Sequence, residues 1–286
     1  MSATGTGHPV AATMVDIIDG ADERADIYSM MRLRRGYLGS CRRLRRVTDN
    51  ATLDVGFTTD GAYDIELERT WSGGADVYLV RWYNQSLAAG GERPGHLQAG
   101  DSASAPRTQI DGQGICLGSQ PAILMQPESW LASMPGVRIS PEDAVAVIWI
   151  GRAVAADHND AGLWSIHEEG LDDARTCEVD GFDRSQVRDR GIYYDRSARF
   201  AHPEGDFTAP SLIVTANAIK PPWMTAAWVN GKSRAVEYRG SVAGLGIGAP
   251  QLLGANVVHT FIVDGARGSP IAATANAAFR VGDWIC

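Results

Sequence analysis

Short apolar segments with the two-residue period of β-strands recur along this chain, and tight-turn signals separate them. Residues 75–83 (ADVYLVRWY) alternate apolar and polar positions and are rich in β-branched and aromatic side chains. Residues 142–150 (EDAVAVIWI) form a nearly continuous apolar run, which predicts a strand covered on both faces. Residues 257–263 (VVHTFIV) predict a last core strand. Together these segments predict an all-β sandwich of two antiparallel sheets.

Two Asx-Gly dipeptides add hairpins to this pattern. Asp111-Gly112 and Asn230-Gly231 each interrupt a strand-like segment. Because Asn, Asp and Gly tolerate a positive φ, such pairs favour two-residue turns between antiparallel strands.

Helix is expected in only two places. Residues 21–35 carry apolar side chains at helical spacing behind aspartates that are suitable N-caps, and residues 271–279 are the second candidate. Residues 84–101 are rich in Gly, Pro and Ser, which predicts a loop. We therefore expect an N-terminal extension over residues 1–26 and a single sandwich domain over residues 27–286.

The charge distribution argues against a nucleic-acid partner. Seven arginines fall between Arg32 and Arg46, yet the whole chain of 286 residues carries a net charge of −8. The acidic remainder of the chain would repel a polyanion. The alternative is that arginines of the predicted strand 42–47 pair with carboxylates close in sequence, which are Asp49, Asp54, Glu66 and Glu68.

The cysteine spacing and the lengths of the apolar runs bear on metal binding, disulfide bonding and membrane insertion. The four cysteines contain no Cys-x-x-Cys pair, which favours free thiols over a zinc site or a disulfide framework: Cys41, Cys116, Cys177 and Cys286. No apolar run approaches the length needed to span a bilayer. The start of the sequence lacks a basic segment followed by an apolar one, so we expect no secretory signal there.

Five sequence blocks follow one another in order within the first third of the chain. They are residues 28–34 (YSMMRLR), 36–39 (GYLG), 48–51 (TDNA), 54–57 (DVGF) and 82–86 (WYNQS). This combination resembles the opening of the arabinofuranosidase-B-like catalytic domain family, a concanavalin A-like (laminin-G-type) sandwich. The family occurs in fungal glycosidases and in phage and gene-transfer-agent structural proteins. The resemblance is strong over about residues 26–120, and it implies an all-β, concanavalin A-like jelly-roll sandwich with a short helical or extended N-terminal extension.

The same resemblance implies that the catalytic residues are missing. Retaining glycosidases use two carboxylates. In the related enzymes the acid/base aspartate follows a Gly-Ile-Gly-Gly run, and residues 246–251 (GIGAPQ) are the nearest equivalent here. No Asp or Glu occurs between Glu237 and Asp264, and Asp195 is the single carboxylate in the segment 190–200 where a nucleophile would be sought. We expect no catalytic residues.

Aromatic residues in loop-rich segments are candidates for sugar binding. Sugar rings lie on aromatic faces while their hydroxyls meet planar polar groups. The candidate carbohydrate-binding residues are Tyr193, Tyr194, Asp195, Arg196, Trp223 and Trp164. The alternative for each is a role in packing.

One acidic loop is a candidate calcium site. Asp157, Asn159 and Asp160 follow the strand predicted at 142–150. Calcium takes about six to eight oxygen ligands, so further ligands would have to come from elsewhere. The alternative is an Asx-rich turn without a metal.

The N-terminal extension is a candidate attachment segment. Its start is polar and rich in Gly, Thr and Ala, and it contains one apolar run that needs a surface to cover it: Met14, Val15, Ile17 and Ile18. The expected partners are capsid, tail or adaptor subunits, with a homo-oligomer left open.

Three functions fit these observations. The first is a non-catalytic structural protein of a phage-like particle, a head fibre, spike or tail component, that binds host surface polysaccharide. It would be made in the bacterial cytoplasm, released by lysis and displayed on the virion surface. The second is a glycoside hydrolase of the arabinofuranosidase type. The third is a lectin-like domain that serves only assembly. We expect no cofactor other than calcium, no nucleic acid and no membrane insertion.

Overall fold

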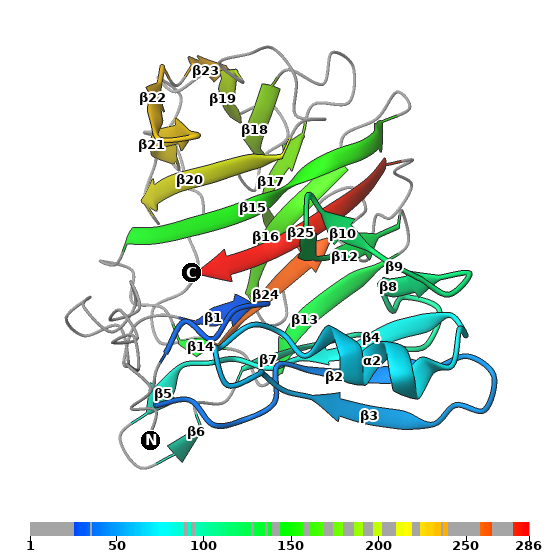
Figure 1. Ribbon diagram of the computed structural model, residues 1–286. Coiled ribbons are helices and arrows are strands. Elements are labelled where there is room, and N and C mark those ends of the chain that lie inside the picture. The colour runs from blue at the N-terminus through cyan, green and yellow to red at the C-terminus, as the bar shows by residue number, and fades with distance from the viewer. Residues whose placement is uncertain are drawn as a thin grey trace, which may run out of the picture.

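The structure is a computed structural model in which almost every element is a β-strand. It describes residues 26–34, 36–88, 91–92, 95–126, 129–134, 137–138, 144–156, 161–168, 174–179, 186–190, 197–201, 210–218, 224–235, 237–239, 258–264 and 277–285. Within these residues the strand pairings are antiparallel, and one short helix, α2, lies among the strands (Figure 1). No helix in this part of the chain is long and apolar enough to cross a bilayer. The all-β sandwich predicted from the sequence is confirmed.

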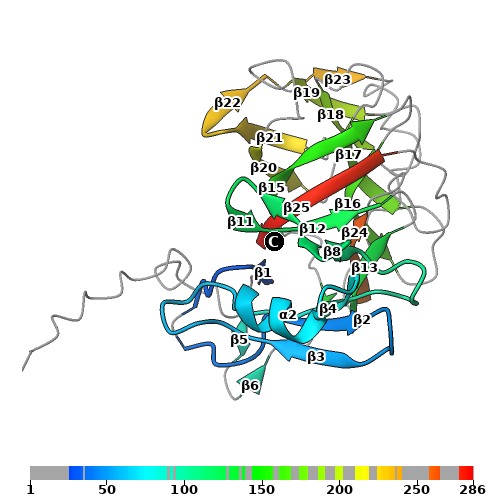
Figure 2. The same ribbon diagram turned by 45° about the vertical axis from the view of Figure 1, so that its right-hand side comes forward.

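The N-terminal part of the fold is a three-stranded antiparallel sheet with a helix. Its strands are β2 (Arg42–Arg46), β3 (Thr52–Val55) and β4 (Val77–Trp82), and β2 lies in the middle. Helix α2 (Ile65–Ser72) connects β3 to β4. It lies on the side of β2 and β3 that faces the rest of the sandwich (Figures 1 and 2). Strand β1 (Ile27–Ser29) does not pair with these three strands and instead pairs with β25 (Ala277–Ile285), close to the C-terminus.

At β4 the sheet divides into two series of strands, because the two ends of β4 pair with different neighbours. The residues Arg81 and Trp82 pair with β7, whereas Val77 and Tyr78 pair with β8. The first series runs in order through β7 (His96–Gln98), β13 (Trp130–Met134), β24 (Val258–Asp264), β16 (Ala161–Glu168), β17 (Ala174–Val179), β18 (Gln186–Arg190), β19 (Ser197–Ala201) and β23 (Glu237–Arg239), with β14 (Val137–Arg138) beside β24.

The second series forms the other layer. It runs through β8 (Arg107–Ile110), β12 (Ile123–Met125), β25 (Ala277–Ile285), β15 (Ala144–Ala156), β20 (Ser211–Ala218), β21 (Met224–Val229) and β22 (Lys232–Arg234), with β9 (Gln113–Gly114) beside β8. Two small hairpins are β5 (Leu87–Ala88) with β6 (Gly91–Glu92), and β10 (Cys116–Leu117) with β11 (Gln120–Pro121). Figure 1 shows β15 and β25 in front of β16 and β24, so the two series form the layers of a concanavalin A-like jelly-roll sandwich.

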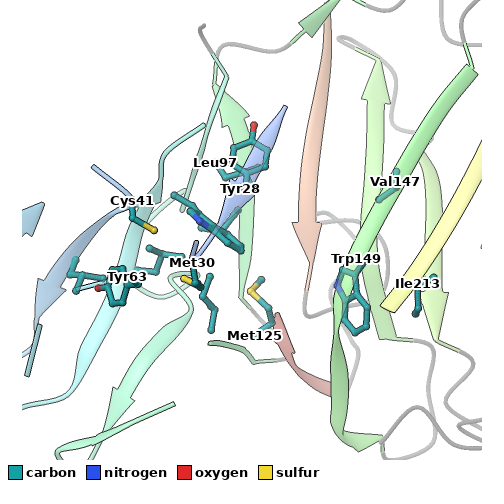
Figure 3. Packing of buried hydrophobic residues seen from close by; sticks show 14 of the residues in the cluster. Tyr28, Met30, Cys41, Tyr63, Leu97, Met125, Val147, Trp149 and Ile213 are labelled. Carbon is teal, nitrogen blue, oxygen red and sulfur yellow. The ribbon is translucent and has the colours of Figure 1, made fainter. Parts of the chain in front are cut away.

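The hydrophobic core lies between these layers. Trp82 on β4 and Trp149 on β15 are its largest apolar side chains, and both are almost completely buried. Tyr28 on β1 packs against Trp82 with 6.1 Å between ring centroids. Figure 3 shows residues of both series in this cluster, among them Leu97 and Val147. The predicted core strands 77–82 and 145–150 are confirmed, and the predicted strand 257–263 corresponds to β24.

The turn predictions are also correct. Asp111 and Gly112 have φ angles of 49° and 73° between β8 and β9, and Asn230 and Gly231 have φ angles of 50° and 75° between β21 and β22.

Three local predictions are wrong. Residues 27–29, expected within a helix, form strand β1, because all three side chains are buried and the backbone pairs with β25. Residues 277–279, also expected to be helical, begin β25. Residues 96–98, expected in a loop, form β7, which fills the space between β4 and β13. In each case pairing with a strand distant in sequence overrides the local preference.

Candidate functional site

Most candidate site residues predicted from the sequence lie outside the described residues. This holds for the candidate sugar-binding residues Tyr193, Tyr194, Asp195, Arg196 and Trp223. It also holds for the calcium candidates Asp157, Asn159 and Asp160 and for the attachment candidates Met14, Val15, Ile17 and Ile18. Trp164 lies on β16, where only the backbone is described. These assignments stay predictions. Within the described part of the chain, no group of three or more His, Cys, Asp or Glu residues is placed to hold a metal ion.

Residues of the block 82–86 (WYNQS) hold β1 and the segment after it in place. All five of its residues are buried. The Asn84 Oδ1 atom accepts hydrogen bonds from the backbone N–H groups of Ile27 and Ser86 at 3.0 and 2.9 Å, and Asn84 Nδ2 donates to the Asp26 carboxylate at 2.7 Å. The amide of Asn84 therefore fixes the chain where it enters β1.

The neighbouring side chain of Gln85 holds the residues that follow β1. Its Nε2 atom donates to the carbonyl oxygens of Ser29 and Met31 at 3.0 and 2.9 Å, and its Oε1 atom accepts from the Leu33 N–H at 2.9 Å. Buried polar groups are tolerated when they are hydrogen-bonded in this way. Asn84 and Gln85, in the block that most strongly marks the family resemblance, thus stabilise the fold, and their side chains are not available to a ligand.

A second polar cluster lies buried under α2. The Glu68 carboxylate accepts hydrogen bonds from the hydroxyl groups of Tyr63 and Thr108, both at 2.7 Å. The Arg42 guanidinium lies 3.8 Å from the same carboxylate and 3.9 Å from the centroid of the Tyr63 ring. Burial raises the pKa of the Tyr63 phenol well above its usual value, so this group remains a hydrogen-bond donor. The cluster anchors α2 to the sheet.

Among the described residues, another group of charged and aromatic side chains lies on the opposite face of β2 and β4. Arg42 and Leu44 point inward from β2, so the side chains between and after them point outward. The outer arginine face, as we call it, consists of four arginines and two tyrosines: Arg43, Arg45, Tyr78, Arg81, Tyr83 and Arg107. The members come from β2, β4 and β8 and from the residue after β4.

One half of this face is built around Asp54. Arg43 forms two hydrogen bonds with the Asp54 carboxylate, from Nε at 2.9 Å and from Nη2 at 2.6 Å, and the Tyr83 hydroxyl donates to it at 2.7 Å. The Arg43 hydrogen bonds hold the pKa of the Asp54 carboxyl below its usual value, against the opposing effect of partial burial. Burial, followed by the hydrogen bond to Asp54, raises the pKa of Tyr83. Arg81 lies beside this group, 5.7 Å from the Tyr83 ring centroid.

The other half is a row of stacked side chains. Tyr78 on β4 lies between Arg45 on β2 and Arg107 on β8, and the guanidinium carbons lie 5.2 and 5.3 Å from its ring centroid. Arg107 also contacts Asp76 at 3.3 Å. Stacking on an aromatic ring orients a guanidinium and leaves its N–H edge available for hydrogen bonds.

The strand arginines were predicted to pair with nearby carboxylates, and most of them do. Arg43 pairs with Asp54, and Arg46 pairs with Asp49 at 2.7 Å. Glu68 meets Arg42 from the helix. Glu66 does not contact the strand, because it is exposed on α2 and pairs with Arg69. The Cys41 and Cys116 thiols contact the carbonyl oxygens of Ser29 and Gly114 at 3.2 and 3.7 Å.

The outer arginine face was not predicted from the sequence. The alternation of Arg43 and Arg45 on a strand indicates that both point the same way. Tyr78 lies about thirty positions from Arg45 and about thirty from Arg107 in the sequence. The strand register brings the three together, and nothing in the local sequence specifies that register.

Comparison with known proteins identifies the fold. No protein-family model and no curated protein sequence matches the chain. Among solved structures, an arabinofuranosidase complexed with arabinofuranosyl-alpha-1,2-xylobiose is similar, with a TM-score of 0.52 and 14% sequence identity. A GH54 a-l-arabinofuranosidase soaked with a cyclic sulfate inhibitor is similar with a TM-score of 0.50 and 13% identity. Each match covers 91% of this chain and 58% of the other, so the chain spans little more than half the length of those enzymes. The similarity confirms the fold that the sequence blocks implied.

Proposed function

We propose that this protein is a non-catalytic, glycan-binding sandwich displayed on a phage-like particle, where it binds host cell-surface polysaccharide and aids adsorption. The observation that carries the proposal is an arabinofuranosidase-like fold without the expected acid/base carboxylate. The fold similarity extends over 91% of the chain. In the segment that resembles the acid/base block, residues 246–251, there is no Asp or Glu. A glycosidase without its proton donor retains a surface for sugars but cannot protonate the leaving group.

The proposed location is the surface of a virion or virus-like particle, with synthesis in the bacterial cytoplasm and release by lysis. The sequence resemblance to phage and gene-transfer-agent structural proteins supports it, and the apolar run within residues 14–18 is the proposed attachment element. Deletion of residues 1–20 should leave a folded sandwich that no longer copurifies with particles. Normal incorporation of the truncated protein would argue against attachment through this segment.

The test of the proposed function is adsorption of particles to encapsulated and capsule-free cells. Particles that carry the protein should adsorb better to encapsulated cells, and Tyr194→Ala or Trp223→Ala should reduce this difference while the domain remains folded. Particles that lack the protein and still adsorb equally well would leave a role in assembly alone.

The glycoside hydrolase remains the second candidate, because the similar solved structures are arabinofuranosidases. The purified protein should release no arabinose from aryl arabinofuranosides. Turnover that is lost on Asp195→Asn would reverse this conclusion and identify Asp195 as a catalytic carboxylate.

A further inference from the structure

The outer arginine face carries an excess of positive charge on an otherwise acidic chain. Its four arginines meet two carboxylates, those of Asp54 and Asp76, so two positive charges are not balanced locally. Arg45 and Arg81 have no ion pair within the described residues: Arg45 donates to the Asn50 side chain, and Arg81 donates to the Gln98 side chain. The chain as a whole carries a net charge of −8. This face is therefore a local positive region against an acidic background.

The strand register places these like charges side by side. Arg43 on β2 is the cross-strand partner of Arg81 on β4, and like charges directly opposite one another destabilise a sheet. Asp54 offsets part of this repulsion from its position on β3 opposite Arg43. Arg45 and Arg107 flank Tyr78 two strands apart, which corresponds to about 10 Å at the usual strand spacing. Neighbouring arginines that repel one another in the free protein are expected at a site where a bound anion offsets their repulsion.

The guanidinium groups are also accessible. The side chain of Arg43 is 39% exposed and that of Arg107 is 26% exposed, while Arg45 and Arg81 are both partly buried. The single hydrogen bonds of Arg45 and Arg81 to neutral amide oxygens leave most of their five N–H donors free among the described contacts. Planar guanidinium groups bind carboxylate and sulfate oxygens through paired hydrogen bonds.

We propose that the outer arginine face binds the carboxylate groups of an acidic polysaccharide. The choice of a glycan as the ligand rests on the proposed function, because the positive charge alone would attract any polyanion. A chain of uronic acids carries one charge per sugar, whereas duplex DNA carries one per about 1.7 Å of its axis. The lower charge density of the glycan reduces its repulsion from the acidic remainder of the protein.

The experiment measures binding of the full-length protein to polygalacturonate, to neutral dextran of similar length and to duplex DNA at equal charge concentration. We expect binding to polygalacturonate that weakens with added salt, with little binding to dextran or DNA. Arg45→Gln and Arg81→Gln should each weaken binding about tenfold, the effect of losing one charge-assisted contact. Arg45→Lys should restore part of the loss, because it keeps the charge but not the planar fork.

Arg69→Gln is the matched control. Arg69 is an exposed arginine on α2, away from this face, and pairs with Glu66. It should leave the affinity for polygalacturonate unchanged, and circular dichroism should show that all variants are folded.

The other outcomes overturn the inference in distinguishable ways. Absence of polygalacturonate binding, or binding that falls equally in the Arg69→Gln control, excludes this face as the site. Stronger binding to DNA than to polygalacturonate makes the face a nucleic-acid surface. If the face fails but particles still prefer encapsulated cells, the proposed function stands with a different site. If the face binds polygalacturonate but particles show no preference for encapsulated cells, the proposed function is wrong while the binding site stands.

Discussion

At the scale of single residues, Asn84 shows why an amide is suited to the position that follows β4 and Tyr83. Its side chain accepts from two backbone N–H groups and donates to Asp26, so it needs both an acceptor and a donor. Asp26 is only 7% exposed and Asn84 is fully buried. The two side chains together close the entry to β1.

Replacement of Asn84 by Asp should therefore destabilise the protein by roughly 2–4 kcal/mol. Two buried carboxylates would face each other, and the hydrogen bond to Asp26 would be lost. Asp26→Asn in the same chain should recover most of the loss by reversing donor and acceptor. Urea denaturation of the single and double variants measures both effects. A double variant no more stable than Asn84→Asp would show that the pair is not the cause.

The Asp54 carboxylate gives the outer arginine face a defined response to acid. Its pKa is lowered in the folded protein by the hydrogen bonds from Arg43, so it contributes stability above its ordinary pKa of 3.8. That contribution is lost as the pH falls through the lower, folded-state value. Asp54→Asn should cost about 0.5–1 kcal/mol at pH 7, since the pair is partly exposed and screened by solvent. The two unfolding free energies should converge as the pH falls below about 4, and parallel profiles would contradict this account.

At the scale of elements, helix α2 was absent from the sequence prediction although its ends are marked. Asp64 caps its N-terminus through a hydrogen bond to the Leu67 N–H, and Gly73 ends it with a φ of 59°. The helix has only eight residues, too few for a clear apolar period. What holds it is the tertiary contact of Glu68 with groups on two other elements and a loop, and the local sequence does not reveal that contact.

Glu68→Gln tests this anchor and should destabilise the protein by about 3–5 kcal/mol. Arg42 would keep a buried charge without a counter-charge, and its Nε and Nη1 atoms already have no hydrogen-bond partner within the described residues. The matched control is Glu66→Gln on the same helix. Glu66 is 75% exposed, so its substitution should change the free energy of unfolding by no more than about 0.5 kcal/mol. Thermal or urea unfolding measures both. Equal effects of the two substitutions would show that the buried contact does not anchor α2.

The alternation of apolar residues and the turn dipeptides were sufficient to predict the core strands from the sequence. Elements that depend on pairing between strands distant in sequence could not be predicted. Residues 77–82 show the predicted alternation because one face of the strand packs into the core. Residues 147–150 were predicted to be covered on both faces, but only Val147 and Trp149 are buried, while Ile148 and Ile150 are partly exposed. Residues 27–29 could not be assigned in the same way. Their partner strand, β25, lies about 250 positions away, and the pairing outweighs the helical spacing of the local sequence. The outer arginine face could not be predicted for the same reason, because its members become neighbours only through the register of β2, β4 and β8.

At the scale of the whole molecule, the fold is shared with proteins whose sequences differ greatly from this one. The sandwich matches arabinofuranosidases over 91% of the chain at 13–14% identity, so the same fold forms although most side chains differ. The residues that carry the family resemblance within 82–86 are buried and stabilise β1 and the segment after it. Asn84 and Gln85 therefore serve folding, and function must be assigned from the exposed surface.

A surface of this kind should bind strongly only when several copies act together. Each guanidinium contact with a hydrated glycan carboxylate replaces contacts with water, so one copy of the protein should bind weakly. Copies held on one particle would engage one polysaccharide chain simultaneously and raise the apparent affinity by roughly 10²–10⁴. Biotinylated protein displayed on streptavidin-coated beads should therefore retain polygalacturonate at concentrations where the free protein does not. Beads that carry the Arg45→Gln/Arg81→Gln double variant should lose most of this retention, because avidity multiplies the loss at each site. Equal binding by free and displayed protein would show that a single copy is sufficient and that display of several copies adds no avidity.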